Sequence, residues 1–232
     1  MKGSKFVIIS SRGIKGRHLS VRKAVSVETY VEKIKPVIRK TKFSQLKVDD
    51  LAKYMDISKV TLYKHFSSKD DIIEQVVDYY IDYSKKADTV VKDDSVSFLD
   101  RFQLTFLQSL MCAAYISDLF LQDLKEFYPH HFENLSVALQ NRNKSLQTFF
   151  ESGMEQQIFN RLNAVMFMVQ DDAVLRRFIE PSFSIQYDIT LKQAIMDFYY
   201  MKQYQLLKPE YLKIIDNSNI EMKIVNILQG IS

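Results

Sequence analysis

The segment Lys42–Lys69, KFSQLKVDDLAKYMDISKVTLYKHFSSK, contains two short helical patterns separated by a tight break. The first pattern has four apolar residues at i, i+3, i+4 and i+7, namely Val48, Leu51, Ala52 and Met55. That spacing places all four on one face of a helix of about two turns. After the break, Leu62 and Phe66 are four residues apart and mark the inner side of a second helix. The segment therefore predicts a helix-turn-helix, whose second helix enters the major groove of DNA.

The outer face of the second predicted helix is polar and basic. Ser58 is a suitable N-cap, and with Leu62 inward the helical rotation turns Val60, Thr61 and Lys64 outward, flanked by Tyr63 and His65. Such a face suits base edges and phosphates, although a solvated helical surface has the same composition. The residues that we expect to contact DNA are Lys47, Ser58, Lys59, Val60, Thr61, Tyr63, Lys64, His65 and Lys69.

The string Thr-Leu-Tyr-x-His-Phe-x-x-Lys, which ends at Lys69, resembles the DNA-binding segment of the TetR family of bacterial transcriptional regulators. The Leu51-Ala52 pair and Ser58 fit the same pattern. The sequence departs from it at Lys42 and Asp56, where the family commonly has Gly, and at Lys47, where the family has a capping Thr or Ser. The resemblance implies a helix-turn-helix head, a helical body that encloses a ligand pocket, and a dimer formed by the last two long helices.

The charge of the chain is divided between its two parts. Residues 1–86 contain 19 Lys and Arg against 10 Asp and Glu, a net of +9, whereas residues 87–232 contain 13 against 18, a net of −5. A basic N-terminal part beside an acidic remainder indicates that the N-terminal part meets a polyanion. Residues 1–26 carry seven basic residues and no acidic one. We expect them to form a flexible basic arm that tracks phosphates, or else a solvated tail.

The predicted head occupies residues 27–86. An apolar stripe from Val27 to Ile38 predicts its first helix, although Pro36 predicts a kink or two shorter pieces. Ser67 or Ser68 caps a long helix that connects head and body. Lys69 lies in the first turn of that helix, where the helix dipole opposes a cation, so a bound phosphate would relieve the conflict. The polar run Lys85–Ser97 marks the expected boundary.

Residues 87–232 predict a helical body, so the fold class is all-α. The expected helices are 98–110, 116–127, 131–153, 162–179 and 189–207, with a loop at Pro181–Ser184 and two short amphipathic stretches after Pro209. Aromatic and Met residues at helical spacing are typical of a core, and also of the wall of an apolar ligand cavity. By position, the residues expected near such a cavity are Phe102, Phe106, Phe149 and Met166.

The last two long helices have apolar residues on more than one face, as helices buried by their own core and by a partner should. The residues expected at a homodimer interface are Val165, Met168, Val169, Phe198, Tyr199 and Met201. A symmetric dimer implies a palindromic double-stranded operator.

No motif predicts catalysis, a cofactor or a metal site, so we do not expect an enzyme. The cluster Glu126, His130, His131 and Glu133 resembles a metal site only if the helix continues through Pro129, and a pair of surface histidines is the simpler interpretation. A single Cys and the lack of a long apolar run predict a cytoplasmic protein without a membrane span.

The leading hypothesis is a repressor that a small apolar ligand releases from its operator by tilting the connecting helix. One alternative is a DNA-binding regulator controlled by a protein partner. Another is a small helical enzyme or carrier, which the charge division and the Thr-Leu-Tyr string disfavour.

Overall fold

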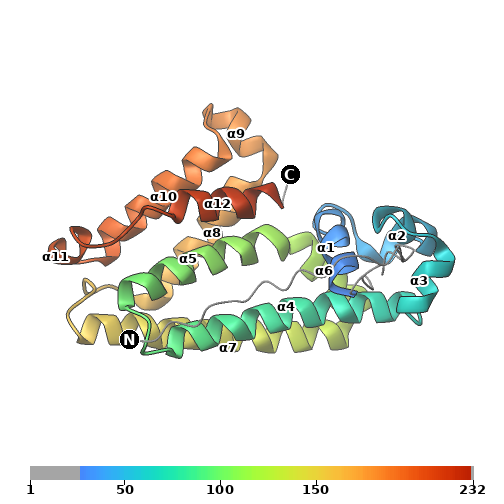
Figure 1. Cartoon of the computed structure of the whole chain (residues 1–232), viewed down its shortest axis with the longest axis horizontal. Helices are drawn as coiled ribbons and strands as arrows, with labels where there is room; N and C mark the ends of the chain where they lie inside the picture. Colours follow the sequence, from blue (N-terminus) through green and yellow to red (C-terminus); the bar gives the residue numbers. More distant parts are fainter. Residues whose placement is uncertain (1–26, 231–232) are drawn as a thin grey trace, which may run out of the picture.

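The structure is a computed structural model and describes residues 27–230; the predicted basic arm 1–26 lies outside them. Within the described residues the secondary structure is helical, apart from one isolated antiparallel bridge between Phe159 and Leu207. The all-α prediction is confirmed. Figure 1 shows a head of short helices at one end and a larger helical body, with long helices running between them.

Short helices build the head. Their bounds are α1 (Val27–Ile38), the 3-10 helix η1 (Phe43–Gln45), α2 (Val48–Tyr54) and α3 (Lys59–His65). The predicted division of α1 at Pro36 is wrong, because α1 continues through it to Ile38. Pro36 lies two residues before the end of the helix, and the buried side chains of Ile34 and Ile38 hold both sides of it in the core.

The turn between α2 and α3 contains a left-handed residue, as a helix-turn-helix requires. Asp56 has φ 58° at this position, where glycine would be free of steric cost. Its short polar side chain makes Asp one of the better substitutes for Gly in this conformation. The departure at Asp56 therefore leaves the geometry of the turn intact.

The connecting helix α4 (Lys69–Lys92) has 24 residues and reaches from the head along the body (Figure 1). Ser68 caps it by accepting the backbone N–H of Asp71, and the carboxylate of Asp71 accepts the backbone N–H of Ser67. The polar run Lys85–Ser97 contains the last residues of α4, which continues to Lys92 and packs against the body, and the break before α5. The division into 27–86 and 87–232 stays a prediction, and α4 belongs to both parts.

The body consists of the remaining helices. Their bounds are α5 (Phe98–Tyr115), α6 (Asp118–Phe127), α7 (Pro129–Glu155), α8 (Ala164–Ile179), α9 (Pro181–Tyr187), α10 (Leu191–Leu206), α11 (Pro209–Leu212) and α12 (Ile220–Gln229). The long helices α4 and α7 lie side by side, α5 packs on α8, and α12 lies against α10 (Figure 1). The expected loop at Pro181–Ser184 is wrong, because Pro181 begins α9 at a position that suits proline.

Between residues 27 and 230, no single helix is long and apolar enough to cross a membrane. Only α5 and α6 taken together reach that length and composition, and they are bent by 60° at their junction.

Candidate DNA-reading helix and body cavity

The helix α3 presents the face that the sequence predicts. Leu62 and Phe66 are buried in the head core, whereas the side chains of Val60 and Tyr63 are 70% and 50% exposed. The hydroxyl of Ser58 accepts the backbone N–H of Thr61 at 3.0 Å, which fixes the start of the helix. A small apolar group, an aromatic hydroxyl and a threonine thus lie together on one outer surface.

Basic side chains flank this surface. Lys64 and Lys47 are exposed, and the Nζ of Lys59 forms an exposed ion pair with Asp49 at 3.0 Å. The hydrogen bond to Asp49 raises the pKa of Lys59, so this ammonium stays charged. His65 rests against the ring of Tyr30, with centroids 5.0 Å apart. The DNA contacts proposed for these residues remain predictions.

Lys69 makes contacts within the head. Its Nζ donates to the backbone oxygen of Ser44 at 2.8 Å and lies over the ring of Phe43, 5.1 Å from its centroid. Partial burial lowers the pKa of this lysine. This hydrogen bond ties the start of α4 to η1, and the expected phosphate contact of Lys69 stays a prediction.

Side-chain hydrogen bonds connect the head to the body. The buried carboxylate of Asp123, on α6, accepts the backbone N–H of Ser44 at 2.9 Å and also its hydroxyl. Arg39, just after α1, donates to the backbone oxygen of Ile179 at the end of α8 at 3.2 Å. These bonds join α6 and α8 of the body to η1 and to the residue just after α1 in the head.

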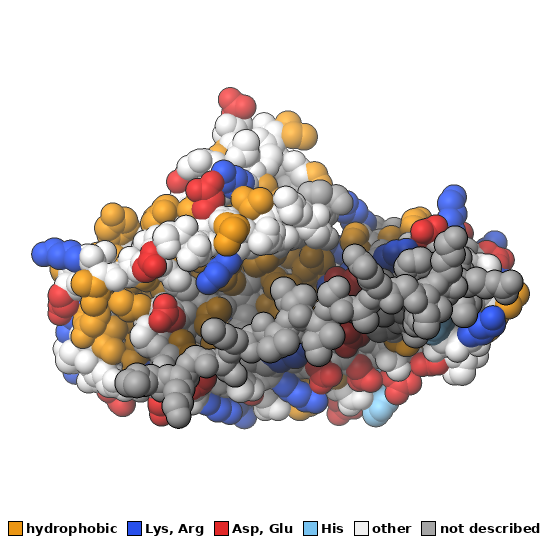
Figure 2. All heavy atoms as spheres, viewed as in Figure 1, with side chains coloured by type: hydrophobic (Ala, Val, Ile, Leu, Met, Phe, Trp, Pro, Cys, Tyr) orange, Lys and Arg blue, Asp and Glu red, His pale blue; other side chains and the backbone are white. Residues whose placement is uncertain are grey.

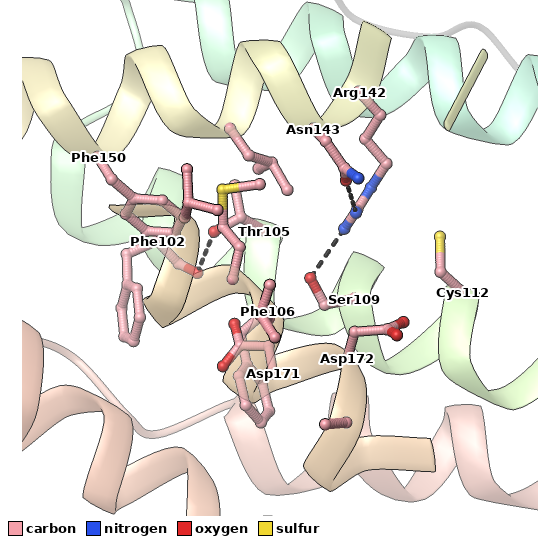
Figure 3. Close-up of a pocket in the computed structure, with 15 residues that line it drawn as sticks. Phe102, Thr105, Phe106, Ser109, Cys112, Arg142, Asn143, Phe150, Asp171 and Asp172 are labelled. Atoms are coloured by element: carbon pink, nitrogen blue, oxygen red, sulfur yellow. Dashed lines mark hydrogen bonds between the residues drawn. The ribbon is translucent and has the colours of Figure 1, made fainter. Parts of the chain in front are cut away.

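The body encloses a cavity of about 280 Å³ between α5, α7 and α8. Its wall is largely apolar, formed by Phe102, Phe106, Leu146, Phe150, Val165, Met168 and Val169. Two of the predicted cavity residues, Phe102 and Phe106, lie in this wall. Figure 3 shows the rings of Phe102 and Phe150 toward one end of the cavity and polar side chains toward the other.

The other two predicted cavity residues lie elsewhere. Phe149 lines a separate surface hollow beside Phe98, on which its ring stacks with centroids 5.5 Å apart. Met166 is 62% exposed and does not line the cavity. Both predictions are corrected, because each residue is adjacent in sequence to one that does line the cavity, and helical rotation turns the neighbour away.

The polar end of the cavity contains Arg142 from α7. One terminal nitrogen of its guanidinium donates to the hydroxyl of Ser109 at 2.8 Å, and the other lies 3.5 Å from the side-chain oxygen of Asn143. Its Nε is buried and has no hydrogen-bond partner. Among residues 27–230 no carboxylate lies within ion-pair distance of Arg142.

A buried ion pair lies beside the cavity. The Nζ of Lys202, on α10, is 2.7 Å from a carboxylate oxygen of Asp171, on α8, and also donates to the backbone oxygen of Phe167 at 2.9 Å. Burial raises the pKa of Asp171 to about 6, against the opposing effect of Lys202. Burial likewise lowers the pKa of Lys202.

The predicted dimer residues divide into two groups. Val165, Val169 and Met201 are 45%, 51% and 62% exposed, and Met168 is partly buried. Phe198 and Tyr199 are enclosed by the chain's own helices, where the ring of Phe106 lies 6.2 Å and 5.1 Å from theirs. The expectation that these two contact a partner is corrected, because they are core residues. Exposed hydrophobic side chains gather at the end of the body that carries α11 (Figure 2).

Arg142, Asp171 and Lys202 are not among the site residues predicted from the sequence, although each carries a signal. Each charged residue interrupts an apolar stripe at helical spacing: Arg142 falls between Leu139 and Leu146, and Lys202 between Phe198 and Leu206. A charge on an inward face must be paired or face a cavity. Within the described part of the chain no cluster of three His, Cys, Asp or Glu is placed to hold a metal ion.

Comparison with known families gives a match to bacterial regulatory proteins of the tetR family over residues 37–76, which cover α2, α3 and the start of α4. No curated protein matches the sequence.

Solved structures share the fold at low identity. The ketosteroid transcriptional regulator KstR2 of Mycobacterium tuberculosis is 14% identical, with a TM-score of 0.56 over 81% of this chain and 97% of that one. AibR in complex with isovaleryl coenzyme A and operator DNA is 12% identical, with a TM-score of 0.52 over 75% and 96%. The TetR-family regulator PfmR from Thermus thermophilus is 15% identical, with a TM-score of 0.53 over 77% and 99%.

Proposed function

We propose that this chain acts as a homodimeric repressor and that a small ligand, bound in the body, releases it from its operator. The chain belongs to the TetR family of bacterial transcriptional regulators and is a DNA-binding regulator. The observation that carries the DNA-binding part is the α3 surface, where Val60, Tyr63 and Lys64 are exposed beside the capped Thr61. We place the protein in the cytoplasm, where its DNA target lies.

The proposed base and phosphate contacts are Lys59, Thr61, Tyr63 and Lys64, with Lys47 and His65 at the DNA backbone. These residues are exposed or half-buried and lie on or beside one helix. Major-groove edges can be contacted by a lysine, by the methyl and hydroxyl of a threonine, and by a tyrosine. Because Lys59 is already paired with Asp49, its contribution to binding requires that it leave this exposed partner, which is a small cost.

Replacing both Thr61 and Lys64 with alanine is expected to weaken binding to the operator by at least about tenfold, because each lost groove contact is worth roughly 1 to 3 kcal/mol. A gel shift with DNA from upstream of the protein's own gene measures this loss. The hydrogen bond from the backbone N–H of Thr61 to Ser58 remains in the variant, so α3 keeps its cap.

The matched control is Lys223→Ala, which removes one exposed lysine of α12 in the body. It lowers the net charge as Lys64→Ala does, and operator binding should stay near that of the unaltered protein. Equal binding by the double variant and the control would show that α3 does not read the operator through this face.

We propose the dimer contact at the exposed apolar side chains of α8 and α10. Val165, Val169 and Met201 supply part of it, and the exposed Tyr200 and Tyr204 of α10 extend it. A two-fold dimer would place two α3 helices on successive half-sites of a palindromic operator.

The release step follows two of the hydrogen bonds between head and body. The cavity is bounded by α8, whose last residue, Ile179, accepts a hydrogen bond from Arg39 of the head. The start of α6 is tied to α8 through Arg176, whose guanidinium lies 3.3 Å from Asp118, and α6 holds Ser44 through Asp123. A ligand that displaces α8 therefore moves both attachments, and it shifts the equilibrium by its preference for the displaced state.

Replacing Asp123 with alanine is expected to lower the free energy of unfolding by about 1 to 3 kcal/mol, because the N–H and hydroxyl of Ser44 lose their acceptor. Urea unfolding measures this change. Operator release by any ligand that binds the body should also require more ligand, because one of the head–body attachments is lost. Glu126→Ala is the control, since this exposed acid of the same helix makes only an exposed pair with Lys42. Equal stability of the two variants would contradict the assigned role of Asp123.

A further inference from the structure

We infer that the ligand of the body cavity is an amphiphilic carboxylic acid, with its hydrocarbon part against the aromatic wall and its carboxylate on Arg142. This inference rests on the proposed ligand-controlled function and names the chemical class of the ligand.

The cavity is lined by charged as well as apolar side chains. Asp171 and Asp172 also line it, but each already has a cation: Lys202 for Asp171, and the Nε of Arg176, at 3.0 Å, for Asp172. Arg142 is the remaining charged group of the lining, and no carboxylate of the described residues pairs with it. A neutral or cationic ligand would leave this guanidinium without a counter-ion.

The guanidinium of Arg142 is buried at the end of the cavity. Arg142 is only 8% exposed, its Nε has no partner, and its guanidinium projects from α7 toward Ser109 across the cavity end (Figure 3). An uncompensated buried charge is costly, so a ligand that neutralises it gains more than it would at the surface. The planar guanidinium matches a carboxylate through two parallel hydrogen bonds, and the Ser109 hydroxyl can supply a third donor.

The apolar wall of the cavity suits the hydrocarbon part of the ligand. The wall beyond Arg142 is formed by aromatic, Leu, Val and Met side chains, with Phe102 and Phe150 at the opposite end (Figure 3). Since a water molecule takes about 30 Å³ in the liquid, a cavity of about 280 Å³ has room for about nine non-hydrogen atoms. Octanoate is close to this size, and its carboxylate and chain match the two ends of the cavity.

The test compares octanoate, octanol and octylamine on the unaltered full-length protein, with melting temperature as the measure of binding and a gel shift as the measure of operator release. Octanoate should raise the melting temperature most and should release the operator at about tenfold lower concentration than octanol, because a hydrogen-bonded charge pair is added. Equal or stronger effects of octanol or octylamine would overturn the carboxylate assignment.

Arg142→Met keeps an unbranched side chain in the cavity wall and removes the charge. The preference for octanoate over octanol should disappear in this variant and should persist in Arg142→Lys, which retains a cation. A preference that survives in Arg142→Met would place the carboxylate elsewhere and refute the inference.

Operator binding without ligand, measured in the same gel shifts, separates the two proposals. If octanol releases the operator as well as octanoate does, the carboxylate fails and the ligand-controlled repressor stands. If none of the three compounds raises the melting temperature or releases the operator, both the acid and control by a small apolar ligand fail, while intact operator binding retains the DNA-binding role.

Discussion

Replacing Lys202 with alanine is expected to lower the free energy of unfolding by about 3 to 5 kcal/mol, which is typical of breaking a buried ion pair on one side. The side chain of Lys202 is almost fully buried. Its Nζ forms an ion pair with Asp171 and donates to the backbone oxygen of Phe167 and to the side-chain oxygen of Gln170. Its removal leaves a buried carboxylate without a counter-ion. Urea unfolding followed by circular dichroism measures the loss.

This loss should depend on pH. The pKa of Asp171 in the folded protein is raised to about 6, so the folded state holds its proton more tightly than the unfolded state. Asp171 therefore contributes most to folding stability at pH values below the ordinary pKa of an aspartate. This contribution is lost as the pH rises through about 6. Without Lys202 the pKa of Asp171 rises further, so the variant should lose more stability in mildly alkaline buffer than in mildly acidic buffer.

Two matched variants isolate the cause. Lys192→Ala removes an exposed lysine of the same helix, paired with Glu221 at the surface, and should cost little. Combining Lys202→Met with Asp171→Leu removes both charges and should recover most of the stability. If Lys202→Ala is as stable as Lys192→Ala, the buried pair contributes nothing to the stability of the fold.

Replacing Gly153 with alanine is expected to destabilise the protein by about 1 to 3 kcal/mol, the usual cost of an overpacked core. A Cβ on Gly153 would overlap the ring of Phe159. That ring is fully buried and contacts the rings of Phe98 and Phe149, with centroids 5.8 Å and 5.6 Å away, so it has no free space to enter. Thermal unfolding should show the change as a lower melting temperature.

The control is Glu155→Ala, two residues further along the same helix, which exchanges an exposed side chain for one of high helix propensity. Adding Phe159→Leu to Gly153→Ala should relieve the overlap, so the double variant should lose less stability than the two single changes combined. Additive losses would mean that Gly153 and Phe159 do not compete for the same space.

The sequence was sufficient to predict the reading helix because its signals are local. The spacing of Leu62 and Phe66 and the cap at Ser58 determine which side of α3 faces outward, and the structure has the same arrangement. The contact of Lys69 within the head was not predicted because it depends on η1, where the backbone oxygen of Ser44 meets the ammonium. No periodicity within α4 contains that information.

The body was predicted less precisely because a stripe of apolar residues does not say what covers it. Phe198, Tyr199 and Met201 lie within one turn of α10, yet the first two enter the core and Met201 faces outward. The same ambiguity placed Met166 at the cavity in place of its neighbour Val165. Only the positions of α5 and α8 around these residues decide between the two sides.

The unbroken length of α4 sets the scale of the movement that could control DNA binding. Its 24 residues, at about 1.5 Å each, give a rod of about 36 Å that ends beside α3. A tilt of about five degrees at the body end would carry the head end by about 3 Å, close to the ~3.4 Å step between successive bases along a strand. In the proposed dimer, a ligand in the cavity would therefore not need to unfold any element, because a small angular change would move each α3 by about one base step relative to its proposed half-site.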